Sequence, residues 1–326
     1  MPRRVLYTDP PFRDFALERE IYDPAGIEVV FPAAPTEAAI AEAAADVDAI
    51  AVCWAPVTAG VIAAAGERLK IVARTGVGLD NIDLAAAAAA GVPVSYVPDY
   101  CVAEMADHAF ALLLGLSRNL GFYRDQARRG EFDQLAAPPM RRLSDDTLGI
   151  VGFGRTGAAL ASRAAACGMR VLAHTRRPGS VPAGVEAVPR DVLFAESDYV
   201  SLHCPLTPET RRIVGTETLP LMRPTACVIN ISRGELVDTD ALEAALLAGE
   251  IGGAALDVFD PEPPDLSRPL FSHPRFLSTP HAAFLSERAL RELRERAARS
   301  VRAAVLGEPI PDLVPASLAG QAAEPA

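Results

Sequence analysis

The sequence has few cysteines, no long hydrophobic run and no excess of positive charge. Its 326 residues include five cysteines, none of them in C-x-x-C spacing. An odd number of scattered cysteines argues against both a disulfide framework and a zinc site, and it indicates a reducing, cytoplasmic environment. We therefore expect no bound metal.

Two further absences narrow the class of protein. The apolar alanine tract at residues 85–90 is far shorter than the run of about 18 residues that a membrane span needs, and no signal-peptide pattern is present. The net charge of −11 argues against a nucleic-acid-binding surface. We expect a soluble protein with no membrane and no nucleic acid as partner, in which local arginines attract any anionic substrate.

Half of the residues are hydrophobic, and the chain is long enough for two domains. Strand-like and helix-like segments alternate in its first part, which predicts a small doubly wound α/β unit. The expected strands are residues 5–8, 27–31, 50–53 and 71–73, and the expected helices are residues 37–45 and 59–65. A long apolar helix at residues 99–120 leads away from this unit, and a polar stretch through Arg142 follows.

The later segments predict a second α/β domain inserted into the first. Strands alternate with helices beyond Leu148, as in parallel βαβ repetition, and an amphipathic helix at residues 286–306 is expected to return to the first unit. The residues after Gly307 are rich in Pro and Ala and are expected to form a loose end. We predict two Rossmann-like parallel-sheet domains: a discontinuous substrate domain of residues 1–100 and 284–326, and a dinucleotide-binding domain of residues 101–283.

The most informative segment begins with an apolar strand at residues 148–151. Gly152, Gly154 and Gly157 follow it in G-x-G-x-x-G spacing and lead into an alanine-rich helix. In this fingerprint the first glycine makes a tight turn, the second lets a pyrophosphate approach the backbone, and the third lets helix and strand pack closely. The segment therefore predicts a dinucleotide site at the helix N-terminus.

The end of the next strand indicates which dinucleotide is bound. An NAD site usually places an acid there for the ribose 2′-hydroxyl, but this strand ends in Thr175, Arg176 and Arg177. Guanidinium groups pair well with a 2′-phosphate, so we predict a preference for NADP(H), with NAD(H) as the alternative. A solvated loop is the other interpretation of the two arginines.

Arg233, Glu262 and His281 each follow a predicted strand late in the chain. Ligands of open α/β sheets bind at the carboxyl ends of strands, so the three side chains are expected to meet in one crevice. Arginine can bind a substrate carboxylate and polarise a carbonyl, while histidine, oriented by a carboxylate, can deliver a proton as hydride arrives. Taken singly, each residue is weak support for a site, because such side chains more often lie on surfaces or in loops.

Together these segments resemble the D-isomer-specific 2-hydroxyacid dehydrogenases, a family that includes D-3-phosphoglycerate dehydrogenases, glyoxylate and hydroxypyruvate reductases and the C-terminal-binding-protein corepressors. The resemblance covers nearly the whole chain. It depends on these segments: RTGVGLDNID at 74–83, VAEMADHAFALLL at 102–114, GIVGFGRTG at 149–157, LHCPLTPETR at 202–211, INISRGELVD at 229–238, GGAALDVFDPEP at 252–263 and TPHAAF at 279–284.

The resemblance implies reduction of a 2-oxo acid to a D-2-hydroxy acid with a nicotinamide cofactor, in a homodimer, at a site between the two domains. It assigns Arg233 to substrate binding, Glu262 to partnering the histidine and His281 to proton transfer. The backbone of Gly76, Val77 and Gly78 would hold the substrate carboxylate. The cofactor residues that it implies are Arg155 and Thr156 at the pyrophosphate turn, Cys204, Pro205 and Thr210 beside the adenosine, and Asp257 at the nicotinamide carboxamide.

The loop at residues 52–56 departs from phosphoglycerate enzymes because it offers no cation for a phosphate, although Arg141 and Arg142 could still supply charge. Its Trp54 fits an apolar wall over a small or hydrophobic substrate and equally a packing role. We therefore favour a glyoxylate-type or other non-phosphorylated 2-oxo acid. The alternatives are an NAD-dependent D-3-phosphoglycerate dehydrogenase and a non-enzymatic, nucleotide-sensing corepressor. His108, on an apolar helix, is expected to be a buried or interface histidine.

Overall fold

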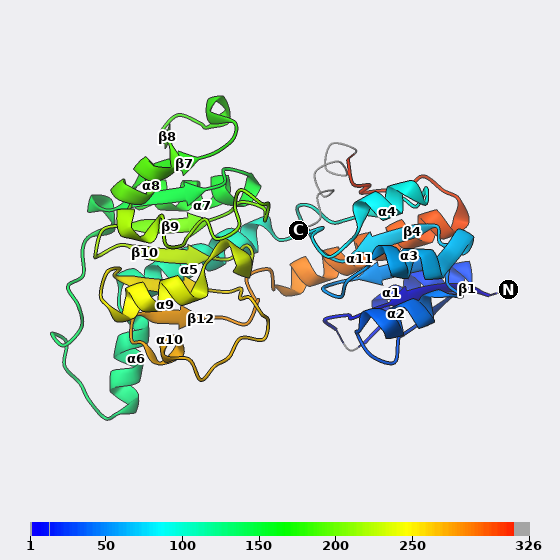
Figure 1. Ribbon diagram of the computed structural model, residues 1–326, viewed down its shortest axis with the longest axis horizontal. Coiled ribbons are helices and arrows are strands. Elements are labelled where there is room, and N and C mark those ends of the chain that lie inside the picture. Colours follow the sequence, from blue (N-terminus) through cyan, green and yellow to red (C-terminus); the bar gives the residue numbers. More distant parts are fainter. Residues whose placement is uncertain (1, 13, 316–326) are drawn as a thin grey trace. The chain divides into compact units, whose positions relative to one another are not determined.

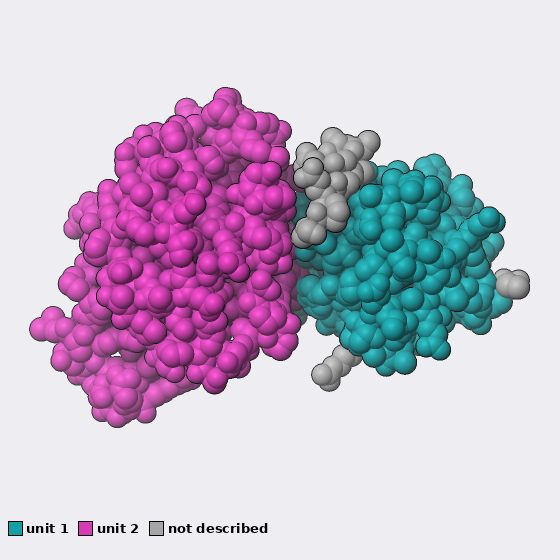
Figure 2. Space-filling model, in the orientation of Figure 1, with its two compact units in different colours: residues 1–100, 286–326 teal, residues 101–285 magenta. Residues whose placement is uncertain are grey.

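The computed structural model describes residues 2–12 and 14–315, which form two compact units (Figures 1 and 2). Unit 1 contains residues 1–100 together with the chain from residue 286 onward, and unit 2 contains residues 101–285. Within the described residues, no helix combines the length and the apolar character that crossing a membrane would require.

Unit 1 is a five-stranded parallel sheet with helices on both faces, in the strand order β2-β1-β3-β4-β5. Its strands are β1 Arg3–Tyr7, β2 Ile27–Val30, β3 Ala49–Val52, β4 Ile71–Arg74 and β5 Val94–Ser95, and its helices are α1 Ala16–Tyr22, α2 Glu37–Ala44, α3 Ala59–Ala65, α4 Leu84–Ala89 and α11 Glu287–Leu306. Alternate residues of each strand point to opposite faces, so α2, α3 and α4 cover one face while α1 and α11 cover the other.

Helix α11 joins unit 1 because its apolar stripe packs on the sheet, with Val301 and Val305 buried beside Val5 and Ile71. Ser286 caps its N-terminus by accepting a hydrogen bond from the amide of Ala289. The expected loose end after Gly307 was wrong as far as residue 315: Leu313 forms an antiparallel bridge with Ser95, and the Val314 amide donates to Val94. The rest of that segment lies outside the described residues.

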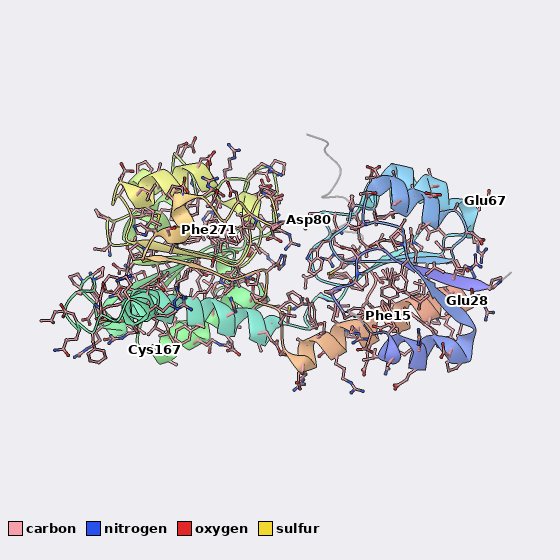
Figure 3. The ribbon with its side chains drawn as sticks, turned by 90° about the horizontal axis from the view of Figure 1, so that it is seen from below. Phe15, Glu28, Glu67, Asp80, Cys167 and Phe271 are labelled. Atoms are coloured by element: carbon pink, nitrogen blue, oxygen red, sulfur yellow. The ribbon has the colours of Figure 1, made fainter. Side chains whose placement is uncertain are left out.

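Unit 2 is a seven-stranded parallel sheet in the order β12-β11-β10-β9-β6-β7-β8, with helices on both faces. Its strands are β6 Thr147–Val151, β7 Arg170–His174, β8 Val185–Ala187, β9 Tyr199–Leu202, β10 Cys227–Asn230, β11 Gly253–Leu256 and β12 Phe276–Ser278, and its helices are α5 Val102–Ser117, α6 Leu120–Arg128, α7 Arg155–Ala166, α8 Arg190–Glu196, α9 Thr239–Leu247 and α10 Pro269–Ser272. The strand order reverses between β6 and β9, which is where the doubly wound fold binds dinucleotides. Figure 3 shows side chains filling the space between sheet and helices in each unit.

The sequence pattern missed α6, which lies within the polar stretch before β6 and extends from unit 2 (Figure 1). The chain folds back along it, because Tyr123 and Asn119 donate hydrogen bonds to the carbonyls of Gln134 and Pro138. Phe132 and Leu135 in the returning segment are 102% and 84% exposed. This ordered arm therefore presents apolar side chains to solvent.

Candidate active site

The three predicted catalytic residues follow three neighbouring strands of unit 2. Arg233 comes after β10, Glu262 after β11 and His281 after β12, and these strands are hydrogen-bonded neighbours in the sheet. Parallel strands end at the same edge, so the three loops share one edge of the sheet.

Glu262 and His281 form a hydrogen-bonded pair. The Nδ1 atom of His281 lies 2.8 Å from Oε2 of Glu262, and Oε1 of Glu262 accepts the amide of Phe259 at 2.8 Å. Partial burial raises the pKa of Glu262, but the hydrogen bonds from His281 and Phe259 and the positive charges of His281 and Arg233 outweigh it, so the pKa lies below its usual value. An ionised carboxylate only accepts, so Nδ1 of His281 donates, and Nε2 is the ring nitrogen that can exchange a proton with a substrate.

His281 has a left-handed backbone conformation, with φ of 52°. Such a conformation costs a non-glycine residue on the order of 1 kcal/mol, so the surrounding loop must hold it in place. The His281 amide donates to the Asp257 carbonyl at 2.7 Å, and the Asp257 carboxylate accepts the amides of Ala282 and Ala283 at 2.8 and 2.9 Å. Asp257 is completely buried and anchors the loop; its implied contact with a nicotinamide carboxamide stays a prediction.

Arg233 sits in a turn braced by its neighbours. The Asn230 side chain donates to the Arg233 carbonyl at 2.6 Å and accepts the Ser232 amide at 3.0 Å. The next position, Gly234, requires glycine because a Cβ there would collide with the backbone of Phe259. This close approach packs the Arg233 loop against the loop that leads to Glu262, so the arginine and the acid are positioned together.

The glycine turn after β6 has the geometry that its sequence predicts. Gly152 has φ of 93°, and a Cβ there would lie 2.5 Å from the Cys204 amide nitrogen. A Cβ at Gly157 would lie 2.5 Å from the Gly152 carbonyl oxygen, whereas at Gly154 it would meet nothing within 4 Å. Helix α7 begins at Arg155 with no side-chain cap. Its first amides and the open side of Gly154 therefore fit a pyrophosphate, with Thr156 in the first turn.

His203, in the LHCPLT segment, ties β9 to this turn. Its Nε2 lies 2.9 Å from the Ser201 hydroxyl and its Nδ1 3.2 Å from the Thr156 hydroxyl. Burial lowers the pKa of His203 to about 4, so the ring is neutral at physiological pH. The sequence reasoning assigned no role to His203, although its place in a quoted motif beside Cys204 was a usable signal.

Thr175, Arg176 and Arg177 follow β7 at the same edge of the sheet, and both arginines are exposed. In the described part of the chain neither guanidinium forms an ion pair. The Thr175 hydroxyl accepts the Arg177 amide at 3.3 Å. Both guanidinium groups therefore lie at the surface of this strand end, with the Arg176 charge near enough to Glu209 to help lower the pKa of that carboxyl.

The loop of Cys204, Pro205 and Thr210 is held by its own hydrogen bonds. The Thr210 hydroxyl donates to the Pro205 carbonyl at 2.7 Å and accepts the Thr207 amide at 2.8 Å. Burial raises the pKa of the Cys204 thiol to about 11, so it is not a reactive thiolate. These hydrogen bonds fix the backbone of the loop, and the thiol of Cys204 carries no charge at neutral pH.

In unit 1, the predicted substrate residues lie on loops after β3 and β4. Arg74 is buried beneath the glycine loop and donates to the carbonyls of Gly78 and Thr75 at 2.8 and 2.6 Å, and a Cβ at Gly76 would collide with its guanidinium group. Val77 is 42% exposed. The Arg74 guanidinium therefore fixes the backbone of the glycine loop through the carbonyls of Thr75 and Gly78.

Trp54 is 45% exposed, which fits both a wall over the substrate and a partly buried packing role, so its place in the substrate site stays a prediction. Its loop is held by Asp9, whose carboxylate accepts the amides of Cys53, Trp54 and Ala55 at 2.5 to 2.9 Å. Asn81 donates to the carbonyls of the same loop. The sequence reasoning missed Asp9, because a single acid after a strand gives no signal of which amides it binds.

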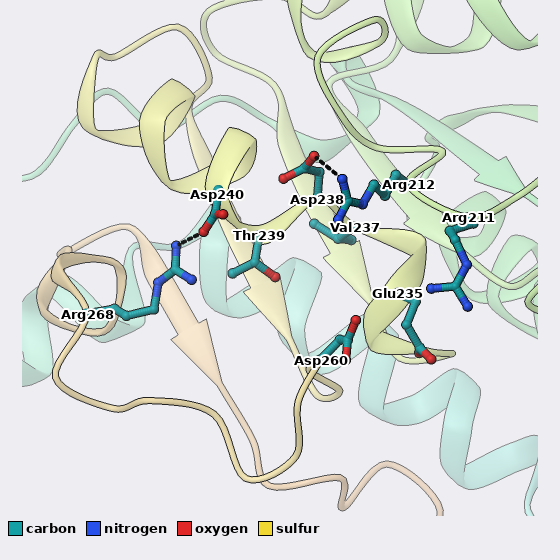
Figure 4. Close-up of a pocket in the computed structure, with 9 residues that line it drawn as sticks. All are labelled: Arg211, Arg212, Glu235, Val237, Asp238, Thr239, Asp240, Asp260 and Arg268. Atoms are coloured by element: carbon teal, nitrogen blue, oxygen red, sulfur yellow. Dashed lines mark hydrogen bonds and ion pairs between the residues drawn. The ribbon is translucent and has the colours of Figure 1, made fainter. Parts of the chain in front are cut away.

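A small polar pocket of about 160 Å³ lies on unit 2, and Glu235 and Asp260 in its lining belong to the loops that carry Arg233 and Glu262 (Figure 4). Its charged walls pair with one another: Arg212 lies 3.5 Å from Asp238, and Arg268 lies 2.7 Å from Asp240. None of the predicted site residues lines it. Four of its charged side chains are paired in this way, and we assign the pocket no part in the reaction.

A glycine turn at the reversal point of a parallel sheet, with an acid–base pair at the same edge, defines a dinucleotide-dependent oxidoreductase. Known proteins bear this out. The family model for the D-isomer specific 2-hydroxyacid dehydrogenase NAD binding domain matches residues 110–283. The chain belongs to this family and is a nicotinamide-dependent D-2-hydroxyacid dehydrogenase.

Individual relatives are similar over most of the chain. A glyoxylate reductase of Korarchaeum cryptofilum is 41% identical over 290 residues, 86% of this chain and 87% of that protein. A D-3-phosphoglycerate dehydrogenase of Synechocystis is 34% identical over 324 residues, 93% of this chain but 58% of that longer protein. The solved structure of a glyoxylate reductase from Paecilomyes thermophila is 28% identical with a TM-score of 0.85, covering 97% of this chain and 99% of that one.

Proposed function

We propose that the enzyme reduces a small, non-phosphorylated 2-oxo acid of the glyoxylate or hydroxypyruvate type to a D-2-hydroxy acid, with NADPH as the preferred reductant. The observation that carries this proposal is the His281–Glu262 pair, held at 2.8 Å on the sheet edge that also bears Arg233. We assign unit 2 as the dinucleotide-binding domain and unit 1 as the substrate domain, in a cytoplasmic protein.

In the proposed mechanism the backbone amides of Gly76, Val77 and Gly78 bind the substrate carboxylate. Arg233 orients the carboxylate and the carbonyl, which withdraws electron density from the carbon. A reduced nicotinamide, when bound, would supply the hydride for that carbon. Nε2 of His281 gives its proton to the carbonyl oxygen as the alkoxide forms, and the carboxylate of Glu262 stabilises the imidazolium before transfer.

The NADPH preference is supported by the absence of an acid at the end of β7 and by the exposed Arg176 and Arg177. The uncapped N-terminus of α7 and the amides near Gly154 would hold the pyrophosphate. The loop of Cys204, Pro205 and Thr210 would line the adenosine. Measuring kcat/KM with NADPH and NADH tests the preference, and a higher value with NADH would overturn it.

Two observations argue against 3-phosphoglycerate as substrate. The loop that follows β3 carries no cation, and Arg141 is occupied by an ion pair of 2.7 Å with Asp146. A panel of glyoxylate, hydroxypyruvate, pyruvate and bulkier 2-oxo acids, with 3-phosphoglycerate oxidation in parallel, tests the substrate class by following NADPH absorbance. If no acid of the panel is reduced, nucleotide sensing is favoured instead.

If the enzyme is active, Arg233→Ala should raise the KM for the oxo acid and lower kcat together.

We also propose a homodimer built on the α6 arm. The exposed Phe132 and Leu135 lie on a segment that is hydrogen-bonded along α6. These hydrogen bonds hold both apolar side chains in a fixed place on the surface of the arm. Replacing both with serine should shift the mass measured by light scattering from dimer to monomer. An unchanged mass would place the interface elsewhere.

A further inference from the structure

His108 of α5 reaches the loop that carries His281. Its Nε2 atom lies 2.9 Å from the Thr279 hydroxyl and 3.6 Å from Oδ1 of Asp257. The ring is about a quarter exposed and is separated from Thr279 by 171 residues of sequence. The histidine of an apolar helix is therefore in polar contact with the active-site loop.

The direction of these hydrogen bonds follows from the donors available. The Thr279 hydroxyl donates its one proton to Oδ1 of Asp257. The hydroxyl oxygen can then only accept from the imidazole, so Nε2 of His108 carries a proton and donates it. The chain of donors runs from His108 through Thr279 to Asp257.

Asp257 is the end of this chain and the anchor of the catalytic loop. Its fully buried carboxylate also accepts the amides of Ala282 and Ala283, and its carbonyl accepts the amide of His281. A carboxylate with several donors keeps one orientation only while each donor stays in place. Without the imidazole, the Thr279 hydroxyl loses one of these two hydrogen-bond partners, and its orientation toward Oδ1 is less constrained.

We propose that His108 is a positioning residue for proton transfer: its Nε2–H directs the Thr279 hydroxyl onto Asp257 and so holds the loop that places His281 against Glu262. This inference rests on the proposed role of His281 as proton donor. The hydrogen bond of His108 goes to Thr279, so His108 acts on His281 and Glu262 through Thr279.

Replacing His108 with leucine or glutamine separates this role from packing. Leucine fills apolar space without a donor, whereas glutamine keeps an N–H at a similar reach. Because small displacements of a reacting group slow proton transfer strongly, His108→Leu should lower kcat for 2-oxo acid reduction by about 10- to 100-fold. It should leave the KM for NADPH within about twofold, and His108→Gln should recover most of the loss.

Thr279→Val tests whether the effect passes through the hydroxyl. The double variant with His108→Leu should be no slower than the worse single variant, because both changes break the same chain. Asp107→Asn is the matched control, since Asp107 lies on the same helix, is exposed and pairs with Arg163 instead. A kcat for His108→Leu within twofold of wild type, a glutamine variant as slow as the leucine variant, or additive losses would overturn the proposal.

A readout that needs no turnover is amide hydrogen exchange at Ala282 and Ala283. Exchange should be faster than wild type in His108→Leu and near wild type in His108→Gln and Asp107→Asn. If the wild-type protein reduces no acid of the panel, the proposed function fails while exchange still decides the role of His108. Unchanged exchange in His108→Leu would overturn that role whatever the activity.

Discussion

The two sheets use the same device at their carboxyl edges, an aspartate that binds backbone amides of a neighbouring loop, but they present different chemistry. Asp9 of unit 1 holds residues 53–55 with amide contacts and is itself half-buried. Asp257 of unit 2 is completely buried and binds Thr279 in addition to two amides. The edge of unit 1 offers backbone groups, whereas that of unit 2 offers reactive side chains.

The difference follows from what each task demands. Binding a carboxylate needs N–H groups, which any residue supplies once its backbone is fixed. Transferring a proton needs one side-chain atom held within a few tenths of an ångström, so more anchors are required. In the proposed mechanism, Arg74 holds the loop that binds the carboxylate, and Asp257 holds the loop that carries the proton donor.

The largest difference in kinetic effect should appear when one side chain is changed at the carboxyl edge of each sheet. His281→Gln should lower kcat by about 10²- to 10⁴-fold, because His281 is the proposed proton donor and glutamine cannot replace it as an acid. Val77→Ala should change the KM for the oxo acid by only about twofold, because the amide of residue 77 remains. Steady-state kinetics with NADPH compares the two, and near-normal turnover of His281→Gln would refute the assignment of the acid.

The folded protein should lose stability at acid pH because of His203 in unit 2. The pKa of His203 is about 4 in the folded protein and near 6.5 when unfolded, so the unfolded chain binds its proton first. The stability that neutral His203 contributes is complete above pH 6.5 and is lost as pH falls toward 4, about 3 kcal/mol in all.

Urea unfolding at pH 7 and pH 5 measures this effect against His203→Gln. The wild type should lose about 2 kcal/mol more than the variant over that interval, since only the unfolded wild-type chain gains a proton at residue 203 that the folded, buried ring does not bind. The buried tyrosines of unit 1, Tyr7 and Tyr22, have pKa values raised by burial and stay neutral throughout. Equal losses in the two proteins would remove His203 as the cause.

Much of this arrangement could be predicted from local patterns. Helix α3, Ala59–Ala65, has the bounds predicted for it, and Thr58 caps its N-terminus. The glycine turn after β6 has the close contacts at Gly152 and Gly157 that its spacing predicts. The roles of Asp9 and His108 could not be predicted, because their partners lie 44 and 171 residues away and a hydrogen bond carries no local pattern. Helix α6 was missed because it is mostly polar, and Leu313 pairs with β5 despite its Pro-rich surroundings.

Substituting the two anchors should separate binding from catalysis. Asp257→Asn should lower kcat by about 10- to 100-fold, because an amide N–H2 turned toward the loop replaces an acceptor by a donor. Asp9→Asn should raise the KM for the oxo acid severalfold and keep kcat within about threefold, since its loop carries Trp54 and no proton-transfer group. A kcat for Asp9→Asn as low as that for Asp257→Asn would erase the distinction between the edges.

The smallest expected change concerns the other half of the unit 2 edge, where β7 ends. Thr175→Asp places a carboxylate where a ribose 2′-hydroxyl can donate to it and where a 2′-phosphate is repelled. The ratio of kcat/KM for NADPH to that for NADH should fall by about tenfold. Thr175→Asn, which has the same shape without the charge, is the control and should move the ratio much less. If both variants keep the wild-type ratio, the ribose end of the cofactor does not lie at this strand, and the exposed Arg176 and Arg177 are solvated surface.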